Sequence, residues 1–167
     1  MKKKISRILT IVLATVLLCM PLAAHAEEPE VQPGPPALIV VARDINICTV
    51  YDKDGNIIRM MPCSTGREGH RTPLGTYSIY AHVDNGGYHA MVDGTYGKWC
   101  MRWKSGGYMF HSVCYAYNGA PEPIAQEVAD IGTSVSRGCV RLQVTDAEWL
   151  YNNTSNGCAV LITEVGN

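Results

Sequence analysis

The chain lacks several features that would assign it to common functional classes. Its 167 residues include 14 lysines and arginines against 15 aspartates and glutamates, for a formal net charge of −1. That balance gives no basic footprint for nucleic acid. Among its seven cysteines there is no C-x-x-C pair, which argues against a metal site. There is no internal repeat. The function must therefore be sought in individual side chains of a single domain.

The first 26 residues have the three parts of an export signal. Lys2, Lys3, Lys4 and Arg7 form a basic start, a mainly apolar run covers residues 8–20, and Ala24-His25-Ala26 follows. The run is short for a membrane span, so we expect cleavage before Glu27 rather than a retained anchor. The leader holds four basic and no acidic residues, so the mature chain carries −1 − 4 = −5. We expect it to act outside the cytoplasm, in the cell wall or periplasm, without a stable membrane anchor.

Residues 27–36 are acidic and proline-rich and are expected to form an extended linker. Residues 37–167 have the length of one domain. Short apolar or alternating runs separated by glycine-containing turns predict strands at 37–42, 46–51, 57–63, 75–82, 88–92, 98–103, 107–113 and 158–164. The fold class that we expect is mainly β, a sandwich or barrel-like domain with one or two short helices.

Two stretches favour a helix. Thr145-Asp146-Ala147-Glu148 has the pattern of a capping box, in which Thr145 accepts from the amide of Glu148. The helix that follows is expected to support the strand before it. A second short helix is predicted at residues 123–131, where apolar residues recur at roughly helical spacing.

Residues 136–142 read Ser-Arg-Gly-Cys-Val-Arg-Leu and place Cys139 directly after Gly138, with an arginine two positions away on each side. The glycine allows a substrate to approach the backbone closely. The two guanidinium groups favour the thiolate, which is the nucleophilic form. These residues predict a reactive cysteine on a tight turn that enters a strand. A buried cysteine in an ordinary β-turn fits the same residues.

A cysteine nucleophile needs a base, and the chain after the leader offers four histidines. His70 lies in a polar loop, and His82 and His89 flank a glycine-rich turn, so all three are expected at the surface or in structural roles. His111 ends the aromatic run Tyr108-Met109-Phe110 and is followed by Ser112. A histidine at the end of a strand is held in place, which suits a base, although a structural core histidine fits this position too.

The motifs taken together resemble the L,D-transpeptidase family. The resemblance lies in Gly107-Tyr108-Met109-Phe110-His111-Ser112 followed by residues 136–142. Arg71-Thr72-Pro73-Leu74-Gly75-Thr76-Tyr77, Ser64-Thr65-Gly66 and residues 146–151 (DAEWLY) add to it in the family's order. It covers nearly the whole domain, from about Leu38 to Ile162.

The resemblance implies a role for each matching residue. Cys139 matches the nucleophile, His111 the residue that takes and returns its proton, and Ser112 the residue whose carbonyl orients that histidine. The amides of Gly138 and Cys139 are expected to stabilise the oxyanion. Substrate contacts are expected from four neighbouring residues, Tyr108, Arg137, Gly138 and Arg141.

The sequence departs from the family pattern in two places. Arg137 stands where the family commonly has histidine, and arginine cannot act as a base near neutral pH. The insert at residues 113–135 is longer than the corresponding segment in the shortest members of the family. It is expected to form a flap over the cleft.

By resemblance, the substrate is the stem peptide of peptidoglycan. Cys139 attacks the carbonyl of the third stem residue, D-alanine leaves, and an amine of a neighbouring stem resolves the thioester to give a 3→3 cross-link. Such an enzyme serves cell-wall biogenesis and cell shape, acts as a monomer, needs no cofactor, and is a target of carbapenems.

The sequence also fits other functions. With water as acceptor the same site is an L,D-carboxypeptidase. A sortase-like enzyme and a non-catalytic wall-binding domain are the other readings. The diamino acid at stem position three, the acceptor and the envelope type stay open. So does the pairing of Cys48, Cys63, Cys100, Cys114 and Cys158, which are expected to be buried hydrophobes or to form disulfides.

Overall fold

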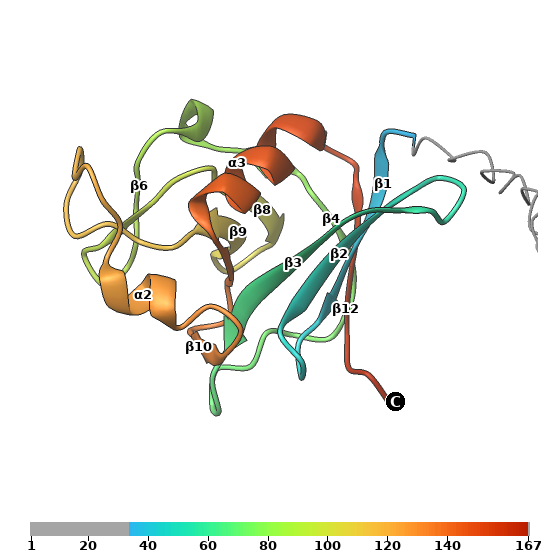
Figure 1. Ribbon diagram of the computed structural model, residues 1–167, viewed down its shortest axis with the longest axis horizontal. Helices are drawn as coiled ribbons and strands as arrows, with labels where there is room; N and C mark the ends of the chain where they lie inside the picture. Colours follow the sequence, from blue (N-terminus) through green and yellow to red (C-terminus); the bar gives the residue numbers. More distant parts are fainter. Residues whose placement is uncertain (1–33, 167) are drawn as a thin grey trace, which may run out of the picture. The chain divides into compact units, whose positions relative to one another are not determined.

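The computed structural model describes residues 34–166, and the predicted export signal and residues 27–33 of the linker lie outside this range. Figure 1 shows its elements. The strands are β1 (Pro36–Ala42), β2 (Ile47–Asp52), β3 (Ile57–Gly66), β4 (Gly75–Ser78), β5 (Ala81–His82), β6 (His89–Ala90), β7 (Tyr96–Gly97), β8 (Met101–Lys104), β9 (Tyr108–Ser112), β10 (Ser134–Ser136), β11 (Val140–Leu142) and β12 (Ala159–Thr163). The helices are α2 (Ala125–Ala129) and α3 (Val144–Asn153), with a 3-10 turn at Asp84–Gly86.

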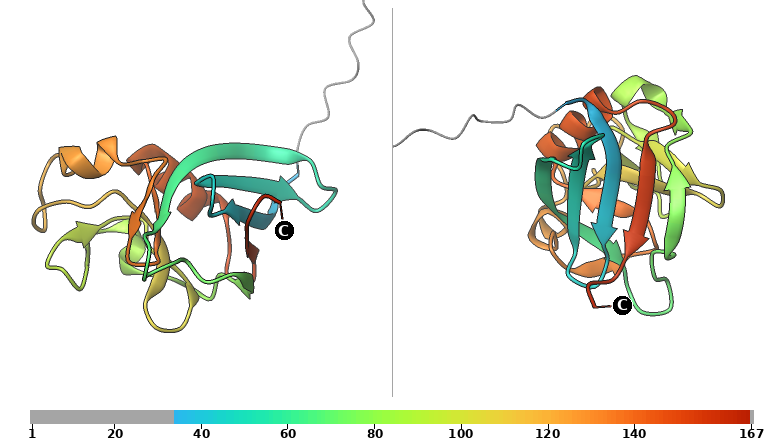
Figure 2. Two further views of the ribbon diagram at one scale, coloured as in Figure 1. Left: turned by 90° about the horizontal axis from the view of Figure 1, so that it is seen from below. Right: turned by 90° about the vertical axis from the view of Figure 1, so that its right-hand side faces the viewer.

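Most strands of residues 34–166 belong to one mixed sheet in the order β4-β12-β1-β2-β3-β11-β9-β8-β5, with β10 paired to β3. The strands β4 and β5 stand at opposite ends of this order, yet only Ile79 and Tyr80 separate them in sequence. The sheet must therefore curl back on itself, and the strands at one side of the curl are seen face-on in the right view of Figure 2. The prediction of a mainly β, barrel-like fold with two short helices is confirmed.

The strand predicted at 75–82 is in fact two strands. The amide of Ile79 bonds to the carbonyl of Cys158, beside β12, while the amide of Tyr80 bonds to the carbonyl of Arg102 in β8, both at 2.9 Å. The chain thus changes partners between two adjacent residues. Side chains continue to alternate between the inner and outer faces of the sheet through this point. The alternating pattern in the sequence therefore could not reveal the change of partner strand.

The core lies between the curled sheet and α3. Its fully buried side chains alternate along the strands, as a half-buried sheet requires. The largest are Trp103, Phe110, Ile39, Met61, Ile79, Met101, Leu142, Leu150 and Ile162. Ala147 and Leu150 bring α3 into this cluster. Burial of a leucine-sized side chain stabilises a fold by about 1.5–3 kcal/mol, so α3 fixes the strands that it covers, β9 and β11.

Helix α3 begins earlier than the capping box predicted. Its N-cap is Gln143, which makes no side-chain cap bond, and Thr145 lies inside the first turn. The cause is the short β11, because the chain turns into the helix directly after Leu142. Asp146 still lies in the first turn, where it forms an ion pair with Arg59 at 2.6 Å. Helix α2 is likewise shorter than the predicted 123–131 and spans Ala125–Ala129.

The other predicted strands exist with altered bounds. The strand predicted at 88–92 is reduced to β6, and the one predicted at 98–103 begins only at Met101. Trp99 has φ = +56°, a left-handed conformation that breaks the strand before it. The strand predicted at 57–63 instead continues to Gly66.

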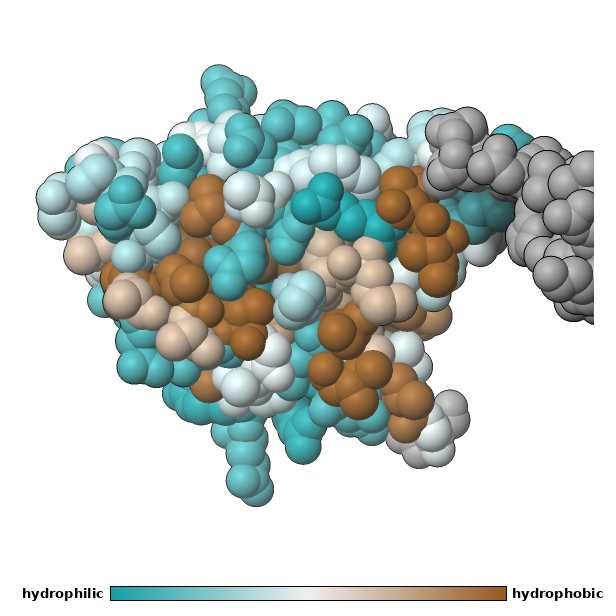
Figure 3. All heavy atoms as spheres, viewed as in Figure 1, coloured by the Kyte–Doolittle hydropathy of each residue, from teal (hydrophilic) through white to brown (hydrophobic). Residues whose placement is uncertain are grey.

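The surface carries separate hydrophobic patches, and polar side chains interrupt them on the face shown in Figure 3. Ile45, Ile57 and Met60, in and beside the β2–β3 region, are each more than half exposed. Within residues 34–166, no helix is long and apolar enough to cross a membrane.

Candidate active site

Strands β8, β9 and β11 form the frame of the site. Val140 pairs with Phe110 and Arg141 with His111 in parallel register, and Arg102 pairs with Met109 in antiparallel register. Successive residues of a strand point to opposite faces. One face therefore carries buried core residues, namely Met101, Trp103, Phe110, Val140 and Leu142. The opposite face carries Arg102, Met109, His111, Cys139 and Arg141, which all line one pocket.

The pocket has a volume of about 190 Å³. Four residues predicted for the site line it: Cys139, His111, Arg137 and Arg141. The other three, Ser112, Gly138 and Tyr108, support the lining residues from behind. Tyr108 and Ser112 share the parity of Phe110 along β9, which directs their side chains away from the pocket.

His111 is held rigidly in the wall of the pocket. Its side chain is buried, and its Nδ1 lies 2.6 Å from the carbonyl oxygen of Ser112. Gly97 packs behind it, so closely that a Cβ there would lie 3.1 Å from Nδ1. Burial lowers the pKa of His111 to about 4, the charge of Arg141 adds to this, and the Ser112 carbonyl only partly opposes it. The imidazole is therefore neutral near pH 7, and the Ser112 contact leaves Nε2 as its proton acceptor.

Cys139 stands on a turn that three hydrogen bonds fix. The amide of Gly138 donates to Ser136 Oγ at 3.0 Å, and that hydroxyl donates to the carbonyl of Cys139 at 2.6 Å. Thr72 Oγ1 donates to the carbonyl of Gly138 at 3.1 Å and accepts from the amide of Gly66 at 2.9 Å. These hydrogen bonds thus connect the motifs at residues 64–66, 71–77 and 136–142. Because the Gly138 amide is engaged with Ser136, the amide of Cys139 is the remaining candidate of the two for an oxyanion.

The half-buried thiol of Cys139 donates to the carbonyl of Gly107 at 3.4 Å. Burial raises the pKa of Cys139, although Arg141 and Arg137 act to lower it. The sequence led us to expect that the arginines would favour the thiolate. Both guanidinium groups do act in that direction, but desolvation outweighs them. The resting pair is accordingly a neutral thiol and a neutral imidazole.

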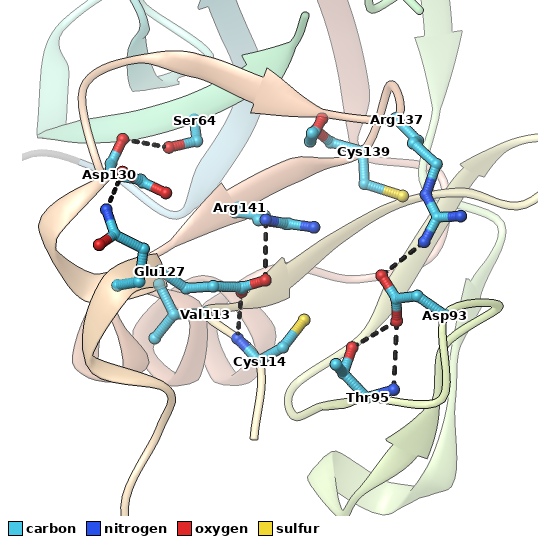
Figure 4. A network of polar contacts seen from close by, with 12 residues as sticks. Ser64, Asp93, Thr95, Val113, Cys114, Glu127, Asp130, Arg137, Cys139 and Arg141 are labelled. Carbon is cyan, nitrogen blue, oxygen red and sulfur yellow. Dashed lines mark hydrogen bonds and ion pairs between the residues drawn. The ribbon is translucent and has the colours of Figure 1, made fainter. Parts of the chain in front are cut away.

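Ion pairs reduce the influence of the two arginines. Arg141 Nη1 lies 2.9 Å from Glu127 Oε1, and Arg137 Nη2 lies 2.5 Å from Asp93 Oδ2. Glu127 also accepts from the amide of Cys114 at 2.7 Å, which ties helix α2 to the chain beyond β9. Figure 4 shows the Cys139 sulfur pointing into the space between these two pairs. Neither partner carboxylate was foreseen, because each lies in a segment far from its arginine in sequence.

A hairpin, not the long insert, borders the pocket. From residues 113–135 only Cys114 lines it, whereas residues 89–93 of the β6–β7 hairpin line it throughout. The prediction of a flap formed by 113–135 is therefore wrong; α2 packs beside the site and supplies Glu127. In the hairpin, Asp93 Oδ1 accepts from the amide and hydroxyl of Thr95 at 3.1 and 2.6 Å. Burial would raise the pKa of Asp93, but the bonds from Thr95 and Arg137 outweigh it and hold it at about 2.

Tyr108 explains why residue 138 is glycine. A Cβ at Gly138 would lie 2.7 Å from Cε1 of the Tyr108 ring, and the residue has φ = +114°. Both facts exclude larger residues without local rearrangement. The Tyr108 ring in turn packs on Trp103, with centroids 5.6 Å apart. This aromatic contact connects the core directly to the turn of Cys139.

The other histidines and cysteines lie partly at the pocket and partly away from it. His89 lines the pocket and contacts Asp84, which the sequence did not indicate. His82 Nδ1 lies 3.0 Å from Asn156 Oδ1, away from the site. The cysteines of residues 34–166 are all free thiols, and no group of three or more metal-ligating side chains occurs in this range. Burial raises the pKa of Cys114 to about 12, so that thiol is protonated.

Comparison with known proteins supports one family. The family model of the L,D-transpeptidase catalytic domain matches residues 36–162. A relative, the putative L,D-transpeptidase YciB of Bacillus subtilis, is 31% identical over 128 residues, which are 72% of this chain and 64% of that protein. The probable L,D-transpeptidase 3 of Mycobacterium tuberculosis is 29% identical over 130 residues, covering 68% of this chain and 41% of that protein. The chain thus spans less than two thirds of the length of these relatives.

Solved structures of L,D-transpeptidases are similar to this chain as well. An L,D-transpeptidase from Mycobacterium smegmatis superimposes with a TM-score of 0.63 at 26% identity, covering 78% of this chain and 59% of that one. L,D-transpeptidase 3 from M. tuberculosis, in complex with a faropenem-derived adduct, gives a TM-score of 0.61 at 25% identity, covering 77% and 61%. Because the family model covers more than half of the sequence, this chain belongs to the L,D-transpeptidase catalytic domain family.

Proposed function

We propose that the protein is an exported L,D-transpeptidase that joins peptidoglycan stems by 3→3 cross-links through a thioester on Cys139. The observation that carries this proposal is the convergence of Cys139 and His111 on one pocket, with His111 Nδ1 held by the Ser112 carbonyl. The family membership supports the reaction class, and the sequence of the first 26 residues supports export.

The protonation states of the free pair determine the order of events. Because both groups are neutral, the Cys139 proton passes to His111 Nε2 as the sulfur attacks the carbonyl carbon of the third stem residue. The amide of Cys139 is the candidate donor to the oxyanion that forms. His111 then gives this proton to the leaving amine, and the C–N bond breaks to release D-alanine.

The second half of the reaction mirrors the first. The amine of a neighbouring stem attacks the thioester, and its proton passes to His111. His111 returns the proton to the sulfur as the C–S bond breaks, which restores the free enzyme. Attack by water at the same step would make the product a tripeptide instead of a dimer.

The decisive experiment uses a defined tetrapeptide stem with the folded protein. Mass spectrometry follows release of D-alanine and formation of a stem dimer, with Cys139→Ala and His111→Ala alongside. We expect both products from the wild type and neither from the variants. Release without a dimer at high acceptor concentration would identify a carboxypeptidase. Wall retention without release, from protein whose fold is verified by circular dichroism, would instead indicate a binding domain.

A covalent inhibitor gives an independent test of the nucleophile. The relative from M. tuberculosis was solved with a faropenem-derived adduct. We expect a carbapenem to add to this chain once, at Cys139, because acylation needs the same sulfur and base as the proposed reaction. Intact-mass measurement checks this expectation. An adduct of equal yield on Cys139→Ala would place the reactive group elsewhere.

A further inference from the structure

Three arginines line the pocket, and one of them differs from the other two in having no ion-pair partner among residues 34–166. Arg137 is paired with Asp93 and Arg141 with Glu127, at 2.5 and 2.9 Å. Arg102 lines the same pocket, and the ion pairs found within residues 34–166 do not include it. A guanidinium group stays charged at any physiological pH. The pocket thus holds one positive charge that forms no ion pair with a carboxylate of residues 34–166.

The backbone of Arg102 is fixed by strand pairing on both sides of β8. The residue pairs with Met109 of β9 on one side and with Ala81 of β5 on the other. Its carbonyl also accepts from the amide of Tyr80 at 2.9 Å. Its neighbours Met101 and Trp103 are buried on the core face, so its side chain lies on the pocket face with Met109 and His111. A charge on such a rigid support is suited to recognition rather than to general solubility.

Arg102 lies beside the strand that carries the base, because it pairs with Met109, two residues before His111. Gly107 lines the pocket with Arg102, and its carbonyl accepts the hydrogen bond from Cys139 Sγ. His111 and Cys114 lie on the side of β9 that leads into the 113–135 segment. A donor whose carbonyl lies at the sulfur is therefore in the same pocket as both the base and the Arg102 cation.

We propose that Arg102 binds a carboxylate of the donor stem and so determines which stems the enzyme accepts. The inference rests on the proposed function for the identity of the ligand. A planar guanidinium offers paired donors that match a carboxylate, and such charge-assisted bonds are among the stronger ones in proteins. Two sources of this chemistry exist in a tetrapeptide stem: the terminal D-alanine carboxylate, and a side-chain carboxylate where the third residue is a diamino diacid.

The test is a cycle of enzyme and substrate changes. With the free-acid tetrapeptide, Arg102→Met should lower kcat/KM for D-alanine release by about tenfold to hundredfold, the scale of a lost charged hydrogen bond. With a stem whose relevant carboxylate is amidated, the wild type should fall by a similar factor and the variant should fall no further. Two amidated stems, one at the terminus and one at the side chain of residue three, decide between the two sources.

The matched control is Lys104→Met, which removes a positive charge from the same strand. Lys104 is two residues from Arg102, does not line the pocket and lies 5.3 Å from the Tyr108 ring. We expect it to change kcat/KM by less than about twofold, since this partly exposed charge lies outside the pocket. Thermal unfolding of both variants shows whether the fold is intact. Equal losses in the two variants would overturn the proposal, as would a loss in Arg102→Met that persists undiminished with both amidated stems.

Binding separates this inference from the proposed function. In the Cys139→Ala background, which cannot turn over, calorimetric titration with the free-acid tetrapeptide gives a dissociation constant directly. Addition of Arg102→Met should raise that constant by about tenfold or more. An unchanged constant overturns the role of Arg102. A raised constant together with a wild type that releases no D-alanine would uphold Arg102 and reject the transpeptidase proposal.

Discussion

The two faces of strands β8, β9 and β11 differ in what their residues do, although they alternate along the same few segments. The core face holds Met101, Trp103, Phe110, Val140 and Leu142, all at 2% exposure or less. The pocket face holds Arg102, Met109, His111, Cys139 and Arg141. Adjacent residues such as Cys139 and Val140 therefore have different roles, because Cys139 faces the pocket and Val140 faces the core. One face supplies the free energy that keeps the frame rigid, and the other carries chemistry that the rigid frame positions.

Charge separates the two faces as sharply as packing does. The core-face residues named above carry no charge, so no ion-pair partner is needed there. On the pocket face the partners come from outside the frame, since Asp93 lies in the β6–β7 hairpin and Glu127 in α2. The site consequently depends on two peripheral segments that contribute little to the core.

The largest expected effect is on the nucleophile. Cys139→Ala should reduce D-alanine release by at least about 10³-fold, because the sulfur forms the covalent intermediate. Its unfolding free energy should change little, since the side chain is only half-buried. Leu142→Ala, three residues along on the core face, should instead lose about 2–5 kcal/mol of stability. Urea denaturation and the release assay distinguish them. Similar stability losses for both variants would refute the division into two faces.

His111 comes next. Replacement by glutamine should lower kcat by about 10²–10⁴-fold, the usual contribution of a positioned base. Rates of release measured for the wild type and His111→Gln at pH 7 provide the test. A variant that retains more than about a tenth of the wild-type kcat would show that another group takes the proton.

The lowered pKa of His111 predicts that the stability of the fold depends on pH. Burial lowers the pKa of His111 from 6.5 to about 4 in the folded protein, so between these values the unfolded chain binds more protons and stability falls as the pH falls. The loss through this group is about 3 kcal/mol at most. His111→Gln cannot titrate and should flatten the urea-midpoint curve between pH 7 and 4. The lowered pKa of Asp93 makes stability depend on pH mainly below its ordinary value of 3.8, which lies below the range from pH 7 to 4.

Gly138→Ala breaks the contact that joins the two faces. The new Cβ would meet the Tyr108 ring at 2.7 Å and require φ = +114°. We expect a loss of about 1–3 kcal/mol in stability and a fall in release of about tenfold to hundredfold as the Cys139 turn shifts. The double variant with Tyr108→Ala removes the clash but not the backbone strain. Partial recovery of activity in the double variant is expected, and no recovery would mean that strain alone matters.

The smallest expected effect concerns the hairpin. Asp93 raises the pKa of Cys139, whereas Arg137 lowers it. Asp93→Asn should therefore make the thiol more acidic and Arg137→Gln less acidic. Alkylation by iodoacetamide at pH 8 should then be faster in the first and slower in the second, each by about twofold to fivefold, the scale of a partly exposed ion pair. Shifts in the same direction would show that loosening of the hairpin outweighs the charges.

Much of the secondary structure could be read from local sequence. The Asp54-Gly55 turn is present between β2 and β3, and Gly55 has the positive φ of +86° that such a turn requires. The apolar run at 37–42 is a strand that starts one residue earlier, at Pro36. The helix start was misjudged, because a capping box competes with the tertiary demand that β11 end at Leu142.

The site was predictable in its side chains but not in its environment. Cys139 and His111 stand in recognisable motifs, and both line the pocket. The thiol's raised pKa was not foreseeable, because desolvation depends on what covers a group and not on its neighbours in sequence. The carboxylates that pair with Arg137 and Arg141 carry no local signal. Neither does Arg102, whose importance appears only when the other two arginines are seen to be paired.

By itself the sequence determined the alternation of faces along each strand, the glycine turns, and the motifs that carry the sulfur and the imidazole. These are local properties, set by backbone sterics and by the period of apolar residues. Tertiary structure alone decided that β9 and β11 pair in parallel, that the chain changes partners at Tyr80, and that a hairpin rather than residues 113–135 borders the pocket. Those outcomes depend on the closure of the sheet, where each contact joins residues that the sequence keeps far apart.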